Sequence, residues 1–269
     1  MKLQLKRIYS QILFFFFANL GAVGIKTGFC YPFFYCHACP TASAACPLRA
    51  LEISVYQGRF DWKLFVYPLV IIGMVGSITG RAVCGWACPI GLLQRATGPV
   101  ARRMKKLNPL PKKTTKLLHE KFHYMKYITL IILVFITPFF IGFMFTDICP
   151  VGVLTGTLPI LLFNPSGFTY SSYFIPAVFI LILFLGLILL IERGWCRYFC
   201  PVGALLAPFN KISMYHVSVD KASCKHCDLC SKVCPMGIDV PSMNRDPECI
   251  LCGKCISYCP HQIIEYKRK

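Results

Sequence analysis

Four long apolar stretches, separated by polar or charged segments, dominate the pattern of the chain. They run over residues 8–25, 64–80, 127–146 and 173–191. A helix needs about 17 to 25 mostly apolar residues to cross the hydrocarbon layer of a membrane, and the second stretch is the marginal one. The pattern predicts a mainly α membrane protein with four transmembrane helices within residues 1–212. A polar segment, 213–269, follows as a separate small domain.

The distribution of basic residues predicts how these helices are oriented. The segment 81–121 carries ten basic residues and one acidic residue, and eleven more basic residues follow Glu192. The segment 147–172 has a single charged residue. Because basic loops stay on the cytoplasmic side, we expect a multi-pass protein of the cytoplasmic membrane with both termini in the cytoplasm. Residues 29–62 and 147–172 then face outward.

Composition agrees with a membrane protein. The chain is 269 residues long, 56% hydrophobic and only 15% charged, with a formal net charge of +18. Soluble domains carry about 25% charged residues. Such a basic balance in a soluble protein would indicate nucleic acid, but here topology and contact with anionic lipid account for it. We therefore expect the membrane, and no nucleic acid, as a partner.

The apolar part of the chain is an internal repeat. Looser copies of an outer Cys-Pro motif occur at Cys46 and Cys149. Each half, about 1–100 and 122–212, thus contains a span, an outer Cys-Pro, a second span and an inner motif. Two copies running in the same direction predict two pseudo-symmetric helical pairs about an axis along the membrane normal. The inner motif reads Arg81-Ala-Val-Cys84-Gly-Trp-Ala-Cys88-Pro-Ile-Gly91 in one half and Arg193-Gly-Trp-Cys196-Arg-Tyr-Phe-Cys200-Pro-Val-Gly203 in the other.

The 17 cysteines indicate metal ligands rather than a disulfide scaffold. A chain of this length can bury a core without disulfides, and an odd number cannot pair completely within one chain. The densest group is Cys224-x2-Cys227-x2-Cys230-x3-Cys234-Pro235, followed by Cys249-x2-Cys252-x2-Cys255-x3-Cys259-Pro260.

This spacing is that of bacterial ferredoxins, in which the fourth cysteine of each run ligates the other cluster. It predicts a small cytoplasmic 2[4Fe–4S] ferredoxin-like α+β domain over 213–269. Structural zinc also uses Cys-x2-Cys pairs, but it leaves the third regular cysteine unexplained. One [4Fe–4S] cluster is assigned to Cys224, Cys227, Cys230 and Cys259, and the second to Cys234, Cys249, Cys252 and Cys255.

Nine cysteines remain in the apolar part, and topology sorts them into two layers. Cys84, Cys88, Cys196 and Cys200 lie just inside the cytoplasmic boundary, where four thiolates about a twofold axis would suit one further [4Fe–4S] cluster. The three-residue spacer suits one turn of helix with both sulfurs on the same face. Two reduced structural or redox-active dithiols are the alternative.

The outer layer consists of Cys30, Cys36, Cys39, Cys46 and Cys149. Cys36, Cys39 and Cys46, completed by Cys30 or Cys149, could hold another cluster. Disulfides are the main alternative in an oxidising outer compartment, and a mononuclear copper site is a third. Near the membrane boundaries, Glu52, Asp147 and Glu192 could accept protons from a quinol, although topological roles are commoner for such residues.

These motifs give the chain a resemblance to the membrane iron–sulfur proteins related to NapH, the quinol-dehydrogenase membrane component of periplasmic nitrate reduction. It is also similar to the C-terminal half of NosR-type proteins and to membrane oxidase-assembly ferredoxins. The likeness rests on the four spans, the paired Cys-x3-Cys-Pro motifs and the two ferredoxin runs, and it covers nearly the whole chain. Cys30, Cys36 and Cys39 look like additions to the simplest pattern.

The resemblance implies an integral membrane protein that relays electrons between the quinone pool, or an outer redox partner, and a further redox partner protein. Its cofactors would be two [4Fe–4S] clusters, one or two more in the membrane part, and a quinone. The chain would then be an electron-transfer subunit of a quinol dehydrogenase or another membrane oxidoreductase, with no catalytic residue of its own. The alternative is a metal-handling or assembly factor whose outer thiols bind or reduce copper.

Overall fold

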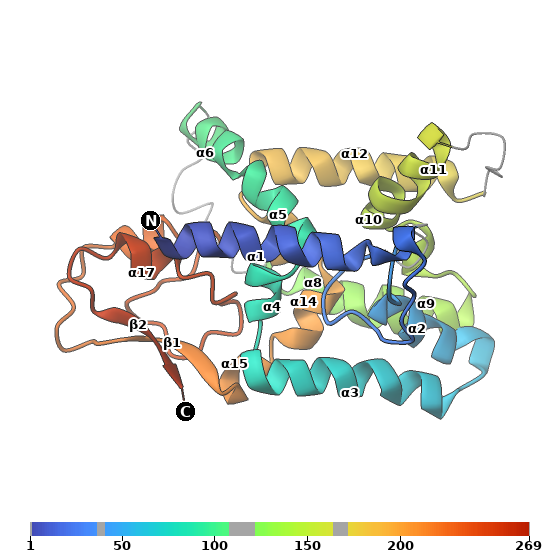
Figure 1. Ribbon diagram of the computed structural model, residues 1–269, viewed down its shortest axis with the longest axis horizontal. Coiled ribbons are helices and arrows are strands. Elements are labelled where there is room, and N and C mark those ends of the chain that lie inside the picture. Colours follow the sequence, from blue (N-terminus) through green and yellow to red (C-terminus); the bar gives the residue numbers. More distant parts are fainter. Residues whose placement is uncertain (1, 37–40, 108–121, 164–171, 269) are drawn as a thin grey trace.

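Long apolar helices lie side by side along the long axis of the molecule, with both termini at the same end (Figure 1). The structure is a computed structural model that describes residues 2–36, 41–107, 122–163 and 172–268, so the predicted ligand Cys39 lies outside the described residues. The long helices are α1 (Lys2–Ala18), α3 (Trp62–Thr79), α12 (Phe174–Leu190) and the continuous run of α8 (Met125–Ile128), π-helix η3 (Thr129–Ile136) and α9 (Thr137–Phe140).

These helices cover the four predicted apolar stretches with shifted ends, but length and composition do not qualify all of them as spans. Within the described ranges, two helical stretches are long and apolar enough to cross a membrane, Trp62–Thr79 and Phe145–Leu162. The apolar helices Met125–Phe140 and Phe174–Leu190 are shorter. Helix α1 carries Lys6 and Arg7 in its first turns.

The helical stretch Phe145–Leu162 corrects one sequence expectation. Its residues belong to the segment 147–172, which we expected to be an outward-facing loop. Pro150 occupies the first helical position of α10, where its fixed φ favours a helix start. An uncharged and mostly apolar stretch follows, and it is helical up to Phe163. This stretch consists of η4 (Phe145–Asp147), α10 (Pro150–Gly152), η5 (Val153–Thr157) and α11 (Leu158–Phe163).

The repeat predicted from the sequence recurs in the short helices. Cys46 caps α2 (Pro47–Ser54) and Cys149 caps α10. At the other end, α4 (Ala82–Trp86) and α5 (Pro89–Ala96) correspond to α13 (Gly194–Tyr198) and α14 (Pro201–Leu206). In all four Cys-Pro motifs the cysteine is the extended N-cap residue and the proline opens the helix. The motif is therefore a helix start that carries a thiol.

The C-terminal segment forms a small α+β unit at the end of the molecule that holds both termini (Figure 1). Strands β1 (Tyr215–Val219) and β2 (Ile264–Arg268) pair antiparallel, with Val219 opposite Ile264. Short helices α16 (Leu229–Lys232) and α17 (Lys254–Tyr258) complete it. The remaining elements are η1 (Leu20–Val23), η2 (Tyr56–Gly58), α6 (Gly98–Leu107) and α15 (Phe209–Ile212).

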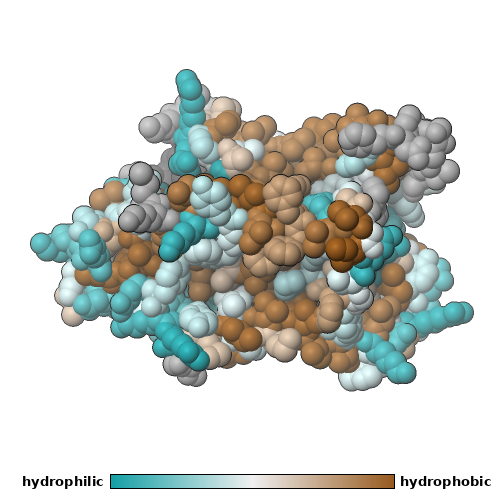
Figure 2. Space-filling model, in the orientation of Figure 1, coloured by the Kyte–Doolittle hydropathy of each residue, from teal (hydrophilic) through white to brown (hydrophobic). Residues whose placement is uncertain are grey.

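The outer faces of the long helices are apolar. Figure 2 shows apolar surface over the middle of the molecule, while charged groups gather towards its two ends. A contiguous apolar surface of this kind marks contact with a membrane or another protein. Exposed apolar side chains on these faces include Phe16, Phe17, Val70, Met74, Ile131, Phe140, Ile175, Phe179 and Ile182.

The ferredoxin-like unit is seated directly on the inner ends of the helices. Asn210 donates from Nδ2 to the carbonyl oxygen of Cys249 at 2.7 Å, and the Trp86 indole donates to Leu251 O at 2.8 Å. Gly85 lies against the carbonyl of Ile250, and a Cβ at Gly85 would collide with that oxygen. The absence of a side chain at Gly85 therefore lets residues 249–252 approach the loop between Cys84 and Cys88.

We expect Gly85→Ala to destabilise the protein by about 1 to 3 kcal/mol, because the added methyl group overpacks this contact. Gly186→Ala is the matched control, since α12 leaves open space around Gly186 and alanine favours helix. Denaturant unfolding in detergent, together with limited proteolysis of the C-terminal unit, measures the difference. Equal stability of the two variants would contradict the close seating.

Candidate iron–sulfur centres

Two cavities of the C-terminal unit each collect cysteines from both ferredoxin runs. One cavity is lined by Cys234, Cys249, Cys252 and Cys255, among apolar neighbours such as Met236 and Ile250. A second cavity is lined by Cys224, Cys227, Cys230 and Cys259. The structure thus brings together each of the two sets of four, with the fourth cysteine of each run at the other run's cavity.

The two runs share an unusual backbone pattern. His226 and Leu251, at the same position in each run, have φ values of 48° and 46°. Asp228 and Gly253, which follow the second cysteine of each run, have φ values of 56° and 64°. Left-handed residues alternating with ordinary ones turn successive N–H groups to one side and create an anion-binding concavity. Such a concavity suits thiolates that carry a negatively charged cluster.

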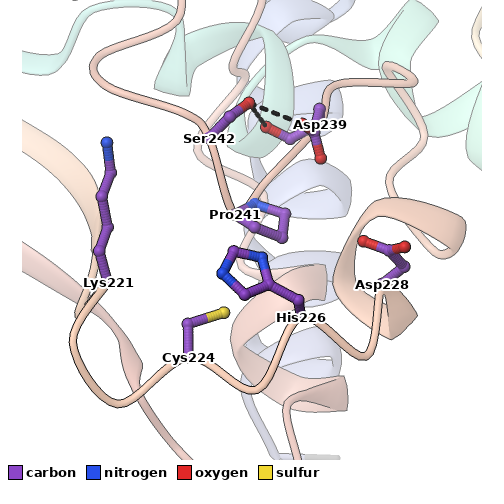
Figure 3. A pocket seen from close by; sticks show the side chains of 7 residues that line it. All are labelled: Lys221, Cys224, His226, Asp228, Asp239, Pro241 and Ser242. Carbon is purple, nitrogen blue, oxygen red and sulfur yellow. Dashed lines mark hydrogen bonds between the residues drawn. The ribbon is translucent and has the colours of Figure 1, made fainter.

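The cavity of Cys224 and Cys227 is the more exposed of the two. Cys227 is exposed, whereas Cys252 is buried. Beside Cys224 lies a surface hollow of about 390 Å³, lined also by Lys221, His226 and Asp239. Figure 3 shows the His226 ring reaching into this hollow between Cys224 and Pro241. We call Cys224, Cys227, Cys230 and Cys259 the distal site, and Cys234, Cys249, Cys252 and Cys255 the proximal site.

The four inner cysteines, which we call the inner site, also converge. Burial, together with the nearby Cys196 and Cys84 thiols, raises the pKa of Cys88 to about 12. The pKa of Cys200 is raised by burial and by the same two thiols, and Cys88 adds to the effect. All four thiols are therefore close neighbours, drawn from equivalent places in the two halves.

The local geometry corrects one detail of the sequence analysis. We expected each Cys-x3-Cys pair to occupy one helical turn. Instead Cys84 lies on α4, while Cys88 lies beyond the end of that helix as the N-cap of α5. Cys196 and Cys200 repeat this arrangement on α13 and α14. The proline after each second cysteine disfavours helical φ and ψ at that cysteine, so the helix ends before it.

Several donors point at the inner sulfurs. Gly203 N donates to Cys200 Sγ at 3.4 Å, and Gln94 Nε2 donates to Cys196 Sγ at 3.1 Å. The Arg81 guanidinium lowers the pKa of the Cys84 thiol, against the larger effect of burial. Hydrogen bonds from neutral and charged donors to sulfur stabilise the thiolate over the thiol.

The first arginine of each repeat motif crosses to the other half. Arg193 donates to Cys84 O at 3.1 Å and to Gly91 O at 3.0 Å. Arg81 donates to Cys196 O at 3.4 Å. The glycine of each motif makes room, since a Cβ at Gly203 would lie 3.0 Å from Arg81 Nη2 and one at Gly91 would lie 3.2 Å from Arg193 Nη1. The motif Arg-x2-Cys-x3-Cys-Pro-x-Gly is therefore a reciprocal clamp.

Four cations are buried around the inner site. Arg7, Arg81, Lys126 and Arg193 are each at most 2% exposed. Glu248 pairs with Arg81 and with Lys126. Among the described residues no carboxylate pairs with Arg7 or Arg193. Buried cations without counter-charge cost several kcal/mol each, so this region needs more negative charge than Glu248 supplies.

The residues present therefore fit a thiolate-bound [4Fe–4S] cluster. Arg7 Nη2, Arg81 Nε and Trp195 Nε1 are buried donors without a hydrogen-bond partner in the described structure. Four thiolates around an iron–sulfur cluster supply both negative charge and acceptor sulfur. Neutral thiols would supply no negative charge and only weakly accepting sulfur. Burial raises the pKa of Cys84, which keeps the isolated thiol protonated.

The outer cysteines form a looser group. One cavity is lined by Cys36, Cys46 and Cys149, with Phe34 and Thr146 among its neighbours. Cys30 lies close enough to Cys46 to help raise the pKa of that buried thiol to about 12. All of the cysteines in the described ranges are free thiols. The structure thus brings Cys30, Cys36, Cys46 and Cys149 to one neighbourhood, and Cys39 lies outside the described residues.

A buried carboxylate lies beside the outer cavity. Glu52 is fully buried on α2 and accepts hydrogen bonds from the hydroxyl and the N–H of Thr146, a residue that lines the cavity. Arg49 donates to Thr146 Oγ1 at 3.0 Å and pairs with Asp147 at 2.9 Å. Burial raises the pKa of Glu52 to about 7, although Thr146 and Arg49 oppose the shift. Glu52 can therefore exchange a proton near neutral pH.

Glu192, the third acidic residue singled out from the sequence, has a different environment. It accepts from Arg102 at 2.7 Å and from Lys254 at 3.0 Å, so it joins α6 and the end of α12 to α17. Burial opposes ionisation, but Arg102 and Lys254 lower the pKa of Glu192 overall. Its role in the structure is to link elements electrostatically.

Within the described ranges, no three Cys, His, Asp or Glu side chains converge as tightly as a single metal ion requires. Clusters hold their thiolates at separate irons. The proximal, distal and outer cysteines each line a shared cavity, and the inner cysteines are linked by mutual electrostatic contacts.

Comparison with known proteins identifies both parts of the chain. A family described as a 4Fe-4S binding domain matches residues 60–108 and 173–216, and another 4Fe-4S binding domain family matches residues 245–265. The protein MJ0750 of Methanocaldococcus jannaschii is 30% identical over 98% of this chain and 96% of its own length. Ferredoxin-type protein NapH of Escherichia coli is 26% identical over 79% of this chain and 72% of its own length.

Regulatory protein NosR of Pseudomonas aeruginosa is 27% identical over 80% of this chain but only 30% of its own length. No solved structure matches. The chain belongs to the NapH/NosR-like family of 4Fe-4S ferredoxin-type proteins. Its family membership and iron–sulfur electron-transfer role agree with the resemblance drawn from the sequence.

The two matches of the first 4Fe-4S family fall on the two repeat halves. Residues 60–108 contain Cys84 and Cys88, and residues 173–216 contain Cys196 and Cys200. In this NapH/NosR-like chain these four cysteines could be predicted from the sequence. The burial of Arg7 and Lys126 beside them could not. The one sequence feature that could have indicated buried positive charge is the arginine that opens each copy of the inner motif, Arg81 and Arg193.

The Glu52 environment predicts a pH effect on stability. The folded-state pKa of about 7 lies above the ordinary value of 4.5, so the folded protein favours the neutral acid. Stability from this group is complete below the ordinary pKa and is lost as pH rises through 7. We expect the wild-type unfolding free energy to fall by about 2 to 3 kcal/mol between pH 5 and pH 8 through Glu52.

Denaturant unfolding in detergent, followed by tryptophan fluorescence, measures this dependence. Glu52→Gln removes the titrating group and should flatten it, whereas the exposed Glu265→Gln should keep the wild-type slope. An unchanged slope in Glu52→Gln would show that Glu52 ionises normally.

Proposed function

We propose that this chain is a membrane-embedded electron conductor. It carries electrons between membrane quinol, the donor at its outer end, and a redox partner protein on the cytoplasmic side. The conducting centres are [4Fe–4S] clusters at the inner, proximal and distal sites and a redox centre at the outer cysteines. The observation that carries the proposal is the order of the elements that hold these cysteines along the long axis of the molecule (Figure 1). The starts of α2 and α10 lie towards one end, those of α5 and α14 in the middle, and the ferredoxin-like unit with its exposed Cys227 at the other end.

Four membrane spans are proposed for residues 1–212, with residues 213–269 as the cytoplasmic unit. The exposed apolar side chains on α1, α3, the α8–α9 run and α12 support this arrangement. The shorter helices would meet the thickness of the membrane with help from flanking aromatic and basic residues, which anchor at the interface. The positive-inside rule places both termini in the cytoplasm.

The inner site is proposed to hold a [4Fe–4S] cluster on Cys84, Cys88, Cys196 and Cys200. Support comes from the buried Arg7, the unmatched positive charge around it and the donors aimed at sulfur. The site lies next to the proximal cysteines, because Ile250 packs on Gly85 between the two sets. The hydrocarbon layer is about 30 Å thick, too wide for one fast electron transfer, so intermediate centres are required.

The order of centres follows from contacts. Electrons pass between the outer and inner sites, then to the proximal set that contains Cys249, and finally to the distal set that contains Cys227. Because Cys227 is exposed and Cys224 borders an open hollow, the distal site is the proposed exit to a soluble partner. Each transfer moves one electron and breaks no bond in the protein.

At the outer end, quinol oxidation would release two electrons and two protons. Glu52 is the proposed acceptor for one proton, since it is buried beside Thr146 and the outer cysteine cavity. Copper bound by the outer thiols, with the clusters supplying electrons for its reduction, is the competing function and is tested by the same metal analysis.

The deciding measurement is iron and acid-labile sulfide per chain in protein purified without oxygen. We expect about twelve to sixteen irons, which corresponds to three or four cubane clusters. A Cys84→Ser/Cys196→Ser double variant should lose about four irons and keep the ferredoxin pair.

A Cys227→Ser variant is the matched control, because it should disturb the distal site and leave the inner one. About eight irons in the wild-type protein would contradict the inner and outer clusters, and stoichiometric copper that is lost on substitution of Cys36 and Cys46 would favour metal handling. Reduction of the clusters by added quinol tests the donor, and its absence in fully loaded protein would exclude quinol.

A further inference from the structure

Arg81 and Arg193 occupy equivalent positions in the two repeat halves, but their surroundings differ in charge. Both guanidinium groups are buried, and each contacts the cysteine loop of the other half. Both lower the pKa of Cys84, against the larger effect of burial. Each arginine therefore acts on the same thiol set from opposite sides.

The difference is a carboxylate. Arg81 Nη1 lies 2.9 Å from Glu248 Oε2 and 3.0 Å from Pro247 O, and Lys126 pairs with the other carboxylate oxygen. Among the residues that the structure describes, Arg193 donates only to backbone carbonyls, and no acidic side chain there pairs with it. The positive charge of Arg81 is thus partly offset, and that of Arg193 is not.

The offsetting carboxylate belongs to the ferredoxin-like unit. Glu248 directly precedes Cys249 of the proximal site, and its own N–H donates to Asp246 Oδ1 at 2.7 Å. Asn210 fixes the same segment through Asp246 O and Cys249 O. The charge at Arg81 therefore depends on how the C-terminal unit is seated.

Charge beside a redox centre shifts its reduction potential in a known direction. Reduction adds one electron, so a buried cation stabilises the reduced form and raises the potential, whereas a nearby carboxylate lowers it. The effect is large in a low-dielectric interior because solvent screens little there.

We propose that Arg81 and Arg193 are positioning residues that set the reduction potential of the inner centre, and that Glu248, supplied by the ferredoxin-like unit, lowers this potential through Arg81. The proposal rests on the cluster assigned to the inner site under the proposed function. One electron enters the inner centre from the outer end and leaves to the proximal cluster, with no proton transferred by the arginines.

The proposal gives the seating of the ferredoxin-like unit a redox consequence. With Glu248 in place, the inner centre is a stronger reductant and passes its electron on more readily. When the unit is displaced, Arg81 and Lys126 lose their counter-charge, the inner centre holds its electron more tightly, and transfer is disfavoured.

The test is an EPR-monitored redox titration of the intact, anaerobically purified protein. The inner signal is the one absent from the Cys84→Ser/Cys196→Ser variant. We expect Glu248→Gln, which keeps shape and an acceptor oxygen, to raise the inner midpoint potential by at least the amount of a tenfold change in the one-electron equilibrium constant, about 59 mV.

Arg193→Gln should lower the inner potential by a similar amount, and Arg193→Lys, which keeps the charge, should restore most of it. Glu265→Gln is the control, because Glu265 is exposed and pairs only with Lys267. Arg193→Gln removes two buried hydrogen bonds, so this variant can fail to fold. In that case the potentials of Glu248→Gln and Arg193→Lys decide the test.

The outcomes separate this inference from the function on which it rests. About eight irons per chain would overturn the inner cluster and this inference together. Twelve or more irons, with an inner potential that is unchanged or lower in Glu248→Gln, would overturn this inference and leave the electron-conducting function standing.

Discussion

Two arginines cross between the repeat halves, and each is buried against the cysteine loop of the other half. Guanidinium groups are costly to bury, so the surrounding structure must provide acceptors and negative charge. Backbone carbonyls and the carboxylate of Glu248 meet part of this demand. The seating of the ferredoxin-like unit follows from it, because Glu248 belongs to that unit and reaches Arg81 only when residues 246–252 lie on Gly85.

The arrangement also explains why the sequence motif contains the residues it does. The cysteine before each proline is an N-cap, and at Cys200 the sulfur accepts a hydrogen bond from Gly203 N at the helix start. The glycine two residues after that proline leaves space for the arginine from the opposite half. One short motif, used twice, thus builds a symmetric pocket, to which Arg7, Lys126 and Glu248 add charges that have no counterpart in the other half.

Much of this architecture could be predicted from the sequence, because cysteine spacing and repeats are local patterns. The partition of the ferredoxin cysteines and the pairing of the two halves are of this kind. The buried charges around the inner site could not be predicted in this way, because Arg7, Lys126 and Glu248 lie far apart in the chain and meet only after folding. The break between Cys84 and Cys88 and the helix within 147–172 were missed because spacing alone does not weigh the effect of a following proline or of an uncharged apolar run.

The crossed clamp has a consequence for biogenesis. When the ribosome has completed the first half, Gly91 and Cys84 still lack the guanidinium that joins them, since Arg193 has not yet been made. Neither half can close its own pocket. Closure of the inner pocket must therefore follow synthesis of Arg193. A polypeptide that ends before this residue would leave the carbonyl oxygens of Cys84 and Gly91 without their guanidinium donor.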